Sequence, residues 1–297
     1  MPDRPALVGR PTLALVGVTA IWGSTFVVVQ HAIEKMPVTD FLTWRFTMAA
    51  LAMLLLRPRS VAALGRSGRQ AGVLLGLALG TGYLLQTLGL QHTSAAVSGF
   101  ITGMFVVLTP LGAAVLLGTR PGWTAWGAVA LATVGLGLLS LHGLSVGSGE
   151  LLTLGCAAAF SLHIVGLGQW AASHDAFGLA VVQLLTTAAL CAVVAVPGGL
   201  AVPPDAGVWG ALALTALAAT ALAFVVQTWA QAHLPPTRAA VVMTMEPVFA
   251  GLFAVAVNGD VLGPKTLLGA ALVLGAMVLT EVGPRRGAEG AQQRLEV

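Results

Sequence analysis

The chain has 297 residues, of which 57% are hydrophobic and 8% are charged, and its formal net charge is +3. A soluble domain carries about 25% charged residues, so this composition excludes an ordinary soluble protein. The apolar runs are continuous rather than alternating, which excludes a membrane β-barrel and predicts an all-α integral membrane protein.

Ten stretches are apolar enough to cross a hydrocarbon core of ~30 Å, which needs about 20 helical residues. In chain order they are residues 11–31, 39–56, 71–91, 94–118, 123–142, 149–170, 176–196, 208–232, 236–257 and 265–283. The connections are short and hold most of the Pro, Arg and Asp residues. The first stretch is too long for a cleavable signal and has no small-residue cleavage site, so we expect it to remain as a span.

The basic residues set an orientation for these spans. With the N-terminus in the cytoplasm, two of the basic residues outside the spans or at their ends, Lys35 and Lys265, fall on the outer side. Eleven fall on the inner side, namely Arg4, Arg10, Arg57, Arg59, Arg66, Arg69, Arg120, Arg238, Arg285, Arg286 and Arg294. This bias follows the positive-inside rule and predicts an inner (plasma) membrane protein with both termini cytoplasmic. It also explains the positive charge without a nucleic-acid partner.

The chain contains an internal duplication. Tyr-Leu-Leu-Gln-Thr at 83–87 corresponds to Phe-Val-Val-Gln-Thr at 224–228, and the Pro110 region corresponds to the Pro247 region. Five helices per half is an odd number, so the second half inserts upside down relative to the first, as in many transporters. The expected organisation is a cytoplasmic N-terminus (1–10), a first five-helix repeat (11–142), a second five-helix repeat (149–283) and a cytoplasmic tail (284–297).

Several short motifs resemble one family. The first helix reads Ile-Trp-Gly-Ser-Thr-Phe at 21–26, the fourth reads Val-Val-Leu-Thr-Pro at 106–110, and the ninth reads Glu-Pro-Val-Phe-Ala at 246–250. In their order and spacing these motifs resemble the EamA-type branch of the drug/metabolite transporter superfamily over residues 12–283. The resemblance implies ten helices, cytoplasmic termini and, in many members, export of small metabolites.

The same resemblance shows where the chain departs from its family. Similar proteins usually carry Gly-Glu-Arg after the fourth and ninth helices. This chain instead has Gly-Thr-Arg at 118–120 and Gly-Asp-Val at 259–261. Because the first half has Thr119 where similar proteins have a glutamate, any role of that carboxylate is not expected in the first half.

Polar and aromatic side chains within the spans predict a solute pathway, because polar groups in hydrocarbon turn towards protein or water. Ser94, Ser98, Thr102 and Thr109 share one helical face, and Gln227 shares a face with Phe224. The predicted pathway residues are Trp22, Thr25, Tyr83, Gln86, Ser98, Thr102, His163, Phe224 and Gln227. Alternatively, the hydroxyls bond their own helices and the aromatic rings and His163 only fill the core.

Two charged groups lie inside spans. Glu246 is near the middle of the ninth span, where it is either a proton-coupling or amine-binding site, or a structural carboxyl that bonds backbone freed by Pro247, the favoured interpretation. Arg45 could attract an anionic group, but snorkelling to the outer headgroups or pairing with Asp40 is the favoured alternative. Pro110 and Pro247 are expected to kink their helices and to act either in alternating access or as fixed kinks.

Other classes of function lack their sequence signatures. The six His are scattered, no metal-binding or nucleophile motif occurs, and no P-loop is present, so neither an enzyme nor a cofactor or metal is predicted. Cys156 and Cys191 are interpreted as packed thiols. As the family resemblance implies, the expected function is secondary active export of small metabolites, with solute, membrane lipid and a coupling proton as partners. Amino acids or their analogues are the solutes expected from the resemblance alone. An uptake permease and a lipid-linked flippase are the alternatives, and the oligomeric state is left open.

Overall fold

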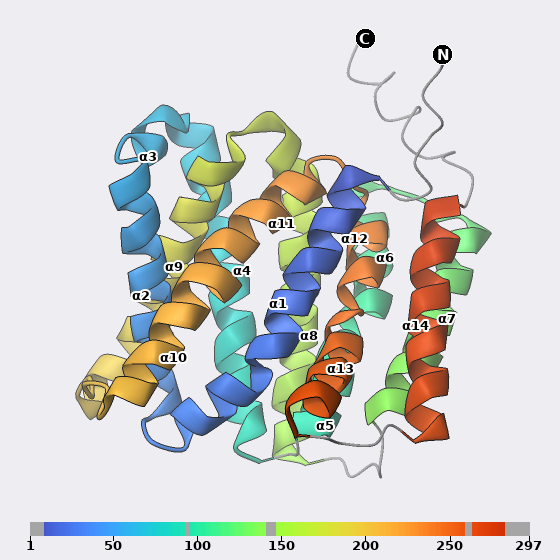
Figure 1. The fold of residues 1–297 in the computed structure, drawn as a ribbon. Coiled ribbons are helices and arrows are strands. Elements are labelled where there is room, and N and C mark those ends of the chain that lie inside the picture. Colours follow the sequence, from blue (N-terminus) through green and yellow to red (C-terminus); the bar gives the residue numbers. More distant parts are fainter. Residues whose placement is uncertain (1–8, 93–94, 141–146, 259–262, 283–297) are drawn as a thin grey trace, which may run out of the picture.

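The computed structural model describes residues 9–92, 95–140, 147–258 and 263–282. The predicted turn at 259–261, both terminal segments and Ser94 lie outside these residues. Within them the fold is a bundle of helices, most of them long and roughly upright (Figure 1). The predicted all-helical class is therefore confirmed for the described part of the chain.

The first half of the chain forms seven helical segments among the described residues. Their bounds are α1 Arg10–Ile33, α2 Val38–Leu56, α3 Ser60–Ala63, α4 Gly65–Leu90, α5 Ala95–Gly103, α6 Phe105–Leu117 and α7 Trp123–Ser140. α4 begins six residues before its predicted start, so Arg66 and Arg69 lie on its first turns rather than in a loop. Gly118 ends α6 in the left-handed conformation (φ 63°), which glycine adopts without steric cost.

The second half repeats this order with more interruptions. Its segments are α8 Ser148–Trp170, η1 Ala171–Ser173, α9 Ala176–Ala195, η2 Val196–Gly198, α10 Ala206–Ala216, η3 Leu217–Leu222, α11 Ala223–Gln231, α12 Pro236–Met243, α13 Glu246–Asn258 and α14 Pro264–Val282. η3 is a π-helical segment that joins α10 to α11 in one continuous helix. Asp175 and Asp205 cap α9 and α10 by accepting backbone N–H bonds of 2.7 and 2.9 Å.

The helices are apolar enough for a membrane. By length and composition, five candidate spans occur in the described part of the chain: 38–56, 65–89, 148–173, 176–198 and 206–231. Shorter apolar helices accompany them at 101–117, 123–138 and 264–279. These helices support the membrane character of the protein, and the ten complete spans expected from sequence stay a prediction.

The predicted helices around Pro110 and Pro247 are each broken in two. The first break is at Met104, where the backbone N–H bonds Ile101 at 3.1 Å, and Pro110 lies farther on, inside α6. The second break covers residues 244–245, and Pro247 is the second residue of the helix that follows. The two breaks therefore stand differently relative to their prolines, because the first half carries its interruption six residues upstream of the ring.

Helix packing brings the two halves together. α4 packs on α8 and α9, and α2 packs on α9. α7 and α14, the last helices of the two halves, lie side by side at the right of Figure 1. A central apolar cluster includes Phe46, Leu79, Leu184 and Phe224, all nearly inaccessible. This cluster forms one wall of the space described next.

Candidate functional site

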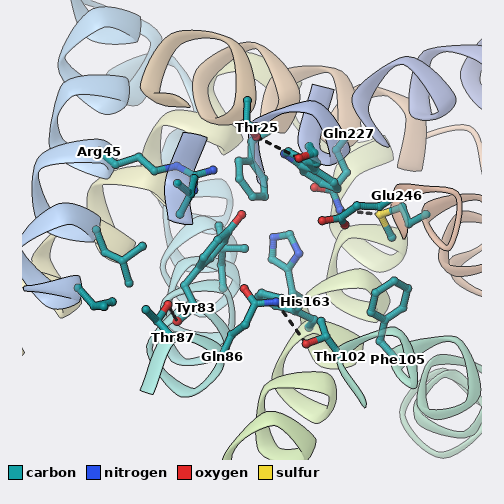
Figure 2. A pocket seen from close by; sticks show the side chains of 18 of the residues that line it. Thr25, Arg45, Tyr83, Gln86, Thr87, Thr102, Phe105, His163, Gln227 and Glu246 are labelled. Carbon is teal, nitrogen blue, oxygen red and sulfur yellow. Dashed lines mark hydrogen bonds between the residues drawn. The ribbon is translucent and has the colours of Figure 1, made fainter. Parts of the chain in front are cut away.

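A cavity of about 520 Å³ lies among α1, α2, α4, α5, α6, α8, α11, α12 and α13. Figure 2 shows side chains from both halves of the chain converging on it. The residues that line it are Trp22, Thr25, Val29, Ile33, Val38, Phe41, Leu42, Arg45, Leu79, Tyr83, Gln86, Thr87, Thr102, Phe105, Phe160, His163, Ile164, Phe224, Gln227, Met243 and Glu246. Its size and its mixture of apolar walls and few polar groups are typical of small-molecule sites.

The structure brings most of the predicted site residues to this one space. All nine predicted pathway residues line it except Ser98, which is buried at 1% exposure but lies outside the lining. Glu246 also lines it, whereas Pro110 and Pro247 do not. The lining residues that were not predicted from sequence include Phe105 and Met243, whose side chains carry no polar signal, and also Thr87. Arg45 lines the cavity too, which neither of its favoured interpretations had placed there.

Aromatic rings form a continuous wall along the cavity. The ring centroid of Tyr83 lies 5.4 Å from that of Phe160 and 6.4 Å from that of Phe224. Phe224 in turn lies 5.7 Å from Trp22 and 6.1 Å from the His163 ring. These separations are those of tilted and edge-to-face ring pairs, which pack a rigid apolar surface. The wall can hold the apolar body of a solute.

The π-helical segment supplies hydrogen-bond acceptors for two cavity residues, Trp22 and Arg45. Trp22 Nε1 donates to the carbonyl oxygen of Ala219 at 2.8 Å, and Arg45 Nη2 donates to the same oxygen at 3.3 Å. Arg45 Nε also donates to Thr220 Oγ1 at 2.7 Å. A π-helical turn disturbs the i→i−4 ladder, and such turns occur frequently at functional sites. The sequence patterns did not predict this π-helical segment.

Arg45 does neither of the things favoured from sequence. Its exposure is 6%, so it does not snorkel, and it lines the cavity. Asp40 does not pair with it, because the two Asp40 oxygens accept from the Ala201 backbone N–H at 2.9 Å and the Thr39 hydroxyl at 3.2 Å. The guanidinium instead stacks near the rings of Phe46 and Tyr83, at 5.6 and 5.4 Å. Asp40 is instead hydrogen-bonded to Ala201, which lies in the connection before α10.

The two predicted glutamines have different surroundings. Gln86 Nε2 donates to Thr102 Oγ1 at 3.2 Å, so Thr102 faces another helix rather than bonding only its own. Gln227 Nε2 contacts Gln231 Oε1 at 3.0 Å and Met243 Sδ at 3.5 Å. Gln227 Oε1 is buried and has no hydrogen-bond partner. An unpaired buried acceptor costs free energy, of the order of 1–3 kcal/mol, unless something satisfies it.

His163 is both a cavity residue and a hydrogen-bonded core residue. Its Nε2 lies 2.8 Å from Gln183 Oε1, and because an amide oxygen only accepts, Nε2 carries the proton. Gln183 Nε2 continues to Thr228 Oγ1 at 3.5 Å. Thr25, in contrast, donates to the carbonyl of Trp22 in its own helix at 3.0 Å. His163 therefore lines the cavity and is also hydrogen-bonded to Gln183.

Glu246 is the first residue of α13, directly after the second break, and its carboxyl points into the cavity (Figure 2). Within the described residues, no hydrogen bond or cation within 4.0 Å meets this carboxyl. The favoured sequence interpretation required a bond to backbone freed by Pro247, and the structure does not contain it.

Comparisons with known proteins bear on this arrangement. A model of the EamA-like transporter family matches residues 10–141 and, separately, residues 147–282. An "Uncharacterized transporter" of Archaeoglobus fulgidus is 34% identical over 271 residues, which cover 91% of this chain and 85% of the relative. A solved structure described as "Crystal structure of protein" has a TM-score of 0.77 at 20% identity, covering 94% of this chain and 99% of that chain. This last likeness concerns the fold alone.

Proposed function

The chain belongs to the EamA-like transporter family, as its motifs indicate, and from this premise we propose that it is a secondary active transporter. Its partner is a small-molecule solute. The proposed activity is export of small metabolites, such as amino acids or their analogues, by alternating access. The proposed location is the cell inner (plasma) membrane, with ten spans and both termini in the cytoplasm.

The observation that carries the proposal is a cavity built from both halves of the chain. Thr25 and Gln86 come from the first half, and His163 and Gln227 come from the second. Sites at the interface of two repeats, near the bilayer midplane, are typical of secondary transporters. The two separate family matches support the repeat, and the positive-inside bias supports its inversion.

The cavity extends towards one end of the bundle. Its lining continues along Val29 and Ile33 on the last turns of α1 and reaches Val38 on the first turn of α2. In the proposed orientation this is the outer end of both helices. At the opposite end, Gln231 Nε2 bonds the Ile164 carbonyl at 3.0 Å and joins α11 to α8. We therefore assign the structure to an outward-directed conformation.

Alternating access needs elements that bend. The breaks at Met104 and at residues 244–245 divide the two equivalent spans next to the cavity, and freed backbone groups there can be used by protein or water. We propose these breaks as the hinges, with Glu246 directly beyond the second one as a coupling group for protons.

Counterflow in membrane vesicles tests the proposal. Right-side-out and inside-out vesicles loaded with an amino-acid mixture should exchange labelled amino acid only when they contain the protein. Export predicts net proton-driven accumulation in inside-out vesicles, while accumulation only in right-side-out vesicles would make the chain an uptake permease. Movement of a labelled lipid-linked substrate, without amino-acid exchange, would make it a flippase and refute the proposal.

A further inference from the structure

Arg45 carries a charge that forms no ion pair within the described part of the protein, although Glu246 interacts with it electrostatically across the cavity. Its Nε and Nη2 groups bond Thr220 Oγ1 and the Ala219 carbonyl, both uncharged acceptors. No carboxylate oxygen of the described residues lies within 4.0 Å of the guanidinium, and the two ion pairs found there, Lys35–Asp205 and Arg57–Asp175, are elsewhere. The Tyr83 hydroxyl is a further uncharged hydrogen-bond partner of the Arg45 side chain. The guanidinium thus has uncharged hydrogen-bond partners among the described residues, and it lines the cavity (Figure 2).

A buried charge without an ion-pair partner is costly. Proteins keep such a group where a ligand or another charge completes it. Thr220 and the rings of Phe46 and Tyr83 fix the guanidinium in place, so it is presented with little loss of side-chain freedom. A fixed planar fork of N–H donors matches the two oxygens of a carboxylate.

We propose that Arg45 is the anion anchor of this cavity and selects solutes that bear a single carboxylate. The proposal rests on the proposed transport function and deepens it by naming a substrate class. The carboxylate bonds the guanidinium where Arg45 lines the cavity, and the apolar part of the solute lies on the wall formed by Tyr83, Phe160 and Phe224.

The charges of the lining favour a monoanion over a phosphate. Arg45 is the one Lys or Arg side chain of the lining, and Glu246 lies in the same lining. A phosphate monoester carries about −1.5 to −2 charges near neutral pH, so a single arginine would leave it partly unbalanced beside an acidic side chain. A carboxylate is balanced by one guanidinium.

A structural role for Arg45 must be separated from a binding role. Arg45→Gln keeps an N–H donor near Ala219 and Thr220 but removes the charge and the fork. Arg57→Gln is the matched control, because Arg57 follows the same helix, is exposed, and contacts Asp175 and Phe177 away from the cavity. The melting temperature without ligand reports any loss of structure in either variant.

The experiment measures thermal stabilisation of the purified full-length protein by four probes: L-phenylalanine, 3-phenylpropionate, L-phenylalanine amide and phenyl phosphate. Wild type and Arg57→Gln should be stabilised by the two carboxylates and much less by the amide or the phosphate. Arg45→Gln should bind the carboxylates at least about tenfold more weakly, the effect of losing roughly 1.4 kcal/mol of charge-assisted hydrogen bonding.

Several results would overturn the anchor. They are equal carboxylate affinity in Arg45→Gln, equal affinity of wild type for phenylalanine and its amide, tighter binding of phenyl phosphate, and no stabilisation by either carboxylate. The acid–amide comparison uses wild type alone, so it decides even if Arg45→Gln does not fold. Arg45-dependent binding without counterflow would contradict the transport function but support Arg45 as the anion anchor. Counterflow of the amide as fast as that of the acid would support transport but contradict the anchor.

Discussion

Gly23 on α1 lies directly against the backbone of Glu246 on α13. A Cβ atom at position 23 would lie 2.8 Å from the Glu246 carbonyl oxygen and 2.8 Å from the Ala250 nitrogen. Glycine therefore lets the helix that carries Trp22 touch the helix that carries the cavity carboxyl. Close backbone contact through small residues is a usual way of packing membrane helices.

Gly23→Ala should destabilise the protein, because backbone atoms on α13 would have to move to accept the new methyl group. Overpacking of this kind costs about 1–3 kcal/mol. Thermal unfolding in detergent measures the loss. Gly17→Ala on the same helix is the control, since a Cβ there meets nothing within 4 Å. Equal melting temperatures for the two variants would show that α1 and α13 are not in tight contact.

The cavity amides should contribute to solute transport. Gln86→Leu and Gln227→Leu keep side-chain volume but remove hydrogen bonding, including the bond from Gln86 to Thr102. We expect about a tenfold loss of counterflow for each, corresponding to roughly 1.4 kcal/mol of lost interaction. Gln70→Leu, an exposed amide near the start of α4, should transport as wild type. Normal counterflow in both cavity variants would reduce the glutamines to contacts between helices.

Glu246→Gln should separate coupling from binding. The side chain has no structural bond among the described residues, so Gln should preserve the fold while removing the titrating group. We expect proton-driven accumulation to be lost and solute exchange to persist without pH dependence. The other charged or titratable lining groups, Arg45, Tyr83 and His163, remain unchanged in this variant. Retention of both proton-driven accumulation and pH dependence would return Glu246 to a structural role.

The topology predicts the sidedness of reporter fusions. Fusions at Val297 and in the segment 57–70 should read cytoplasmic, because the basic residues gather on that side. Fusions near Lys35 and Lys265 should read external. The physical basis is the eleven-to-two distribution of Lys and Arg outside the spans or at their ends. An external reading at Val297 would be incompatible with ten spans.

Much of the site could be predicted because hydrocarbon makes polar residues conspicuous. Gln86, Gln227 and Glu246 stand out in apolar helices, and the internal duplication placed their helices in related positions. The position of Arg45 could not be predicted from sequence. Asp40, its expected partner, instead accepts a hydrogen bond from the backbone N–H of Ala201, which is 161 positions away in the chain. The hydrogen bonds that the Ala219 carbonyl accepts in the π-helical segment depend on backbone geometry that the residue types alone do not specify.

The helix breaks show the same division. Proline marks the region of each interruption, but the first break lies at Met104, six residues before Pro110, where the Met104 N–H bonds the Ile101 carbonyl. Glu246 begins the helix that follows the second break. Helical class and approximate spans follow from apolar length, whereas the direction of individual side chains requires the packed bundle.

The most direct test of the central claim is an untargeted comparison of metabolites in the growth medium. Cells expressing wild type, Thr25→Trp and Leu55→Trp at equal membrane levels would be compared with cells that lack the protein. Thr25 lines the cavity, so its tryptophan should block the path, whereas Leu55 is 82% exposed and its tryptophan should face lipid. We predict that a small carboxylate-bearing metabolite accumulates in the medium for wild type and Leu55→Trp but not for Thr25→Trp. Equal media for wild type and cells without the protein, or equal export by Thr25→Trp, would contradict transport through this cavity.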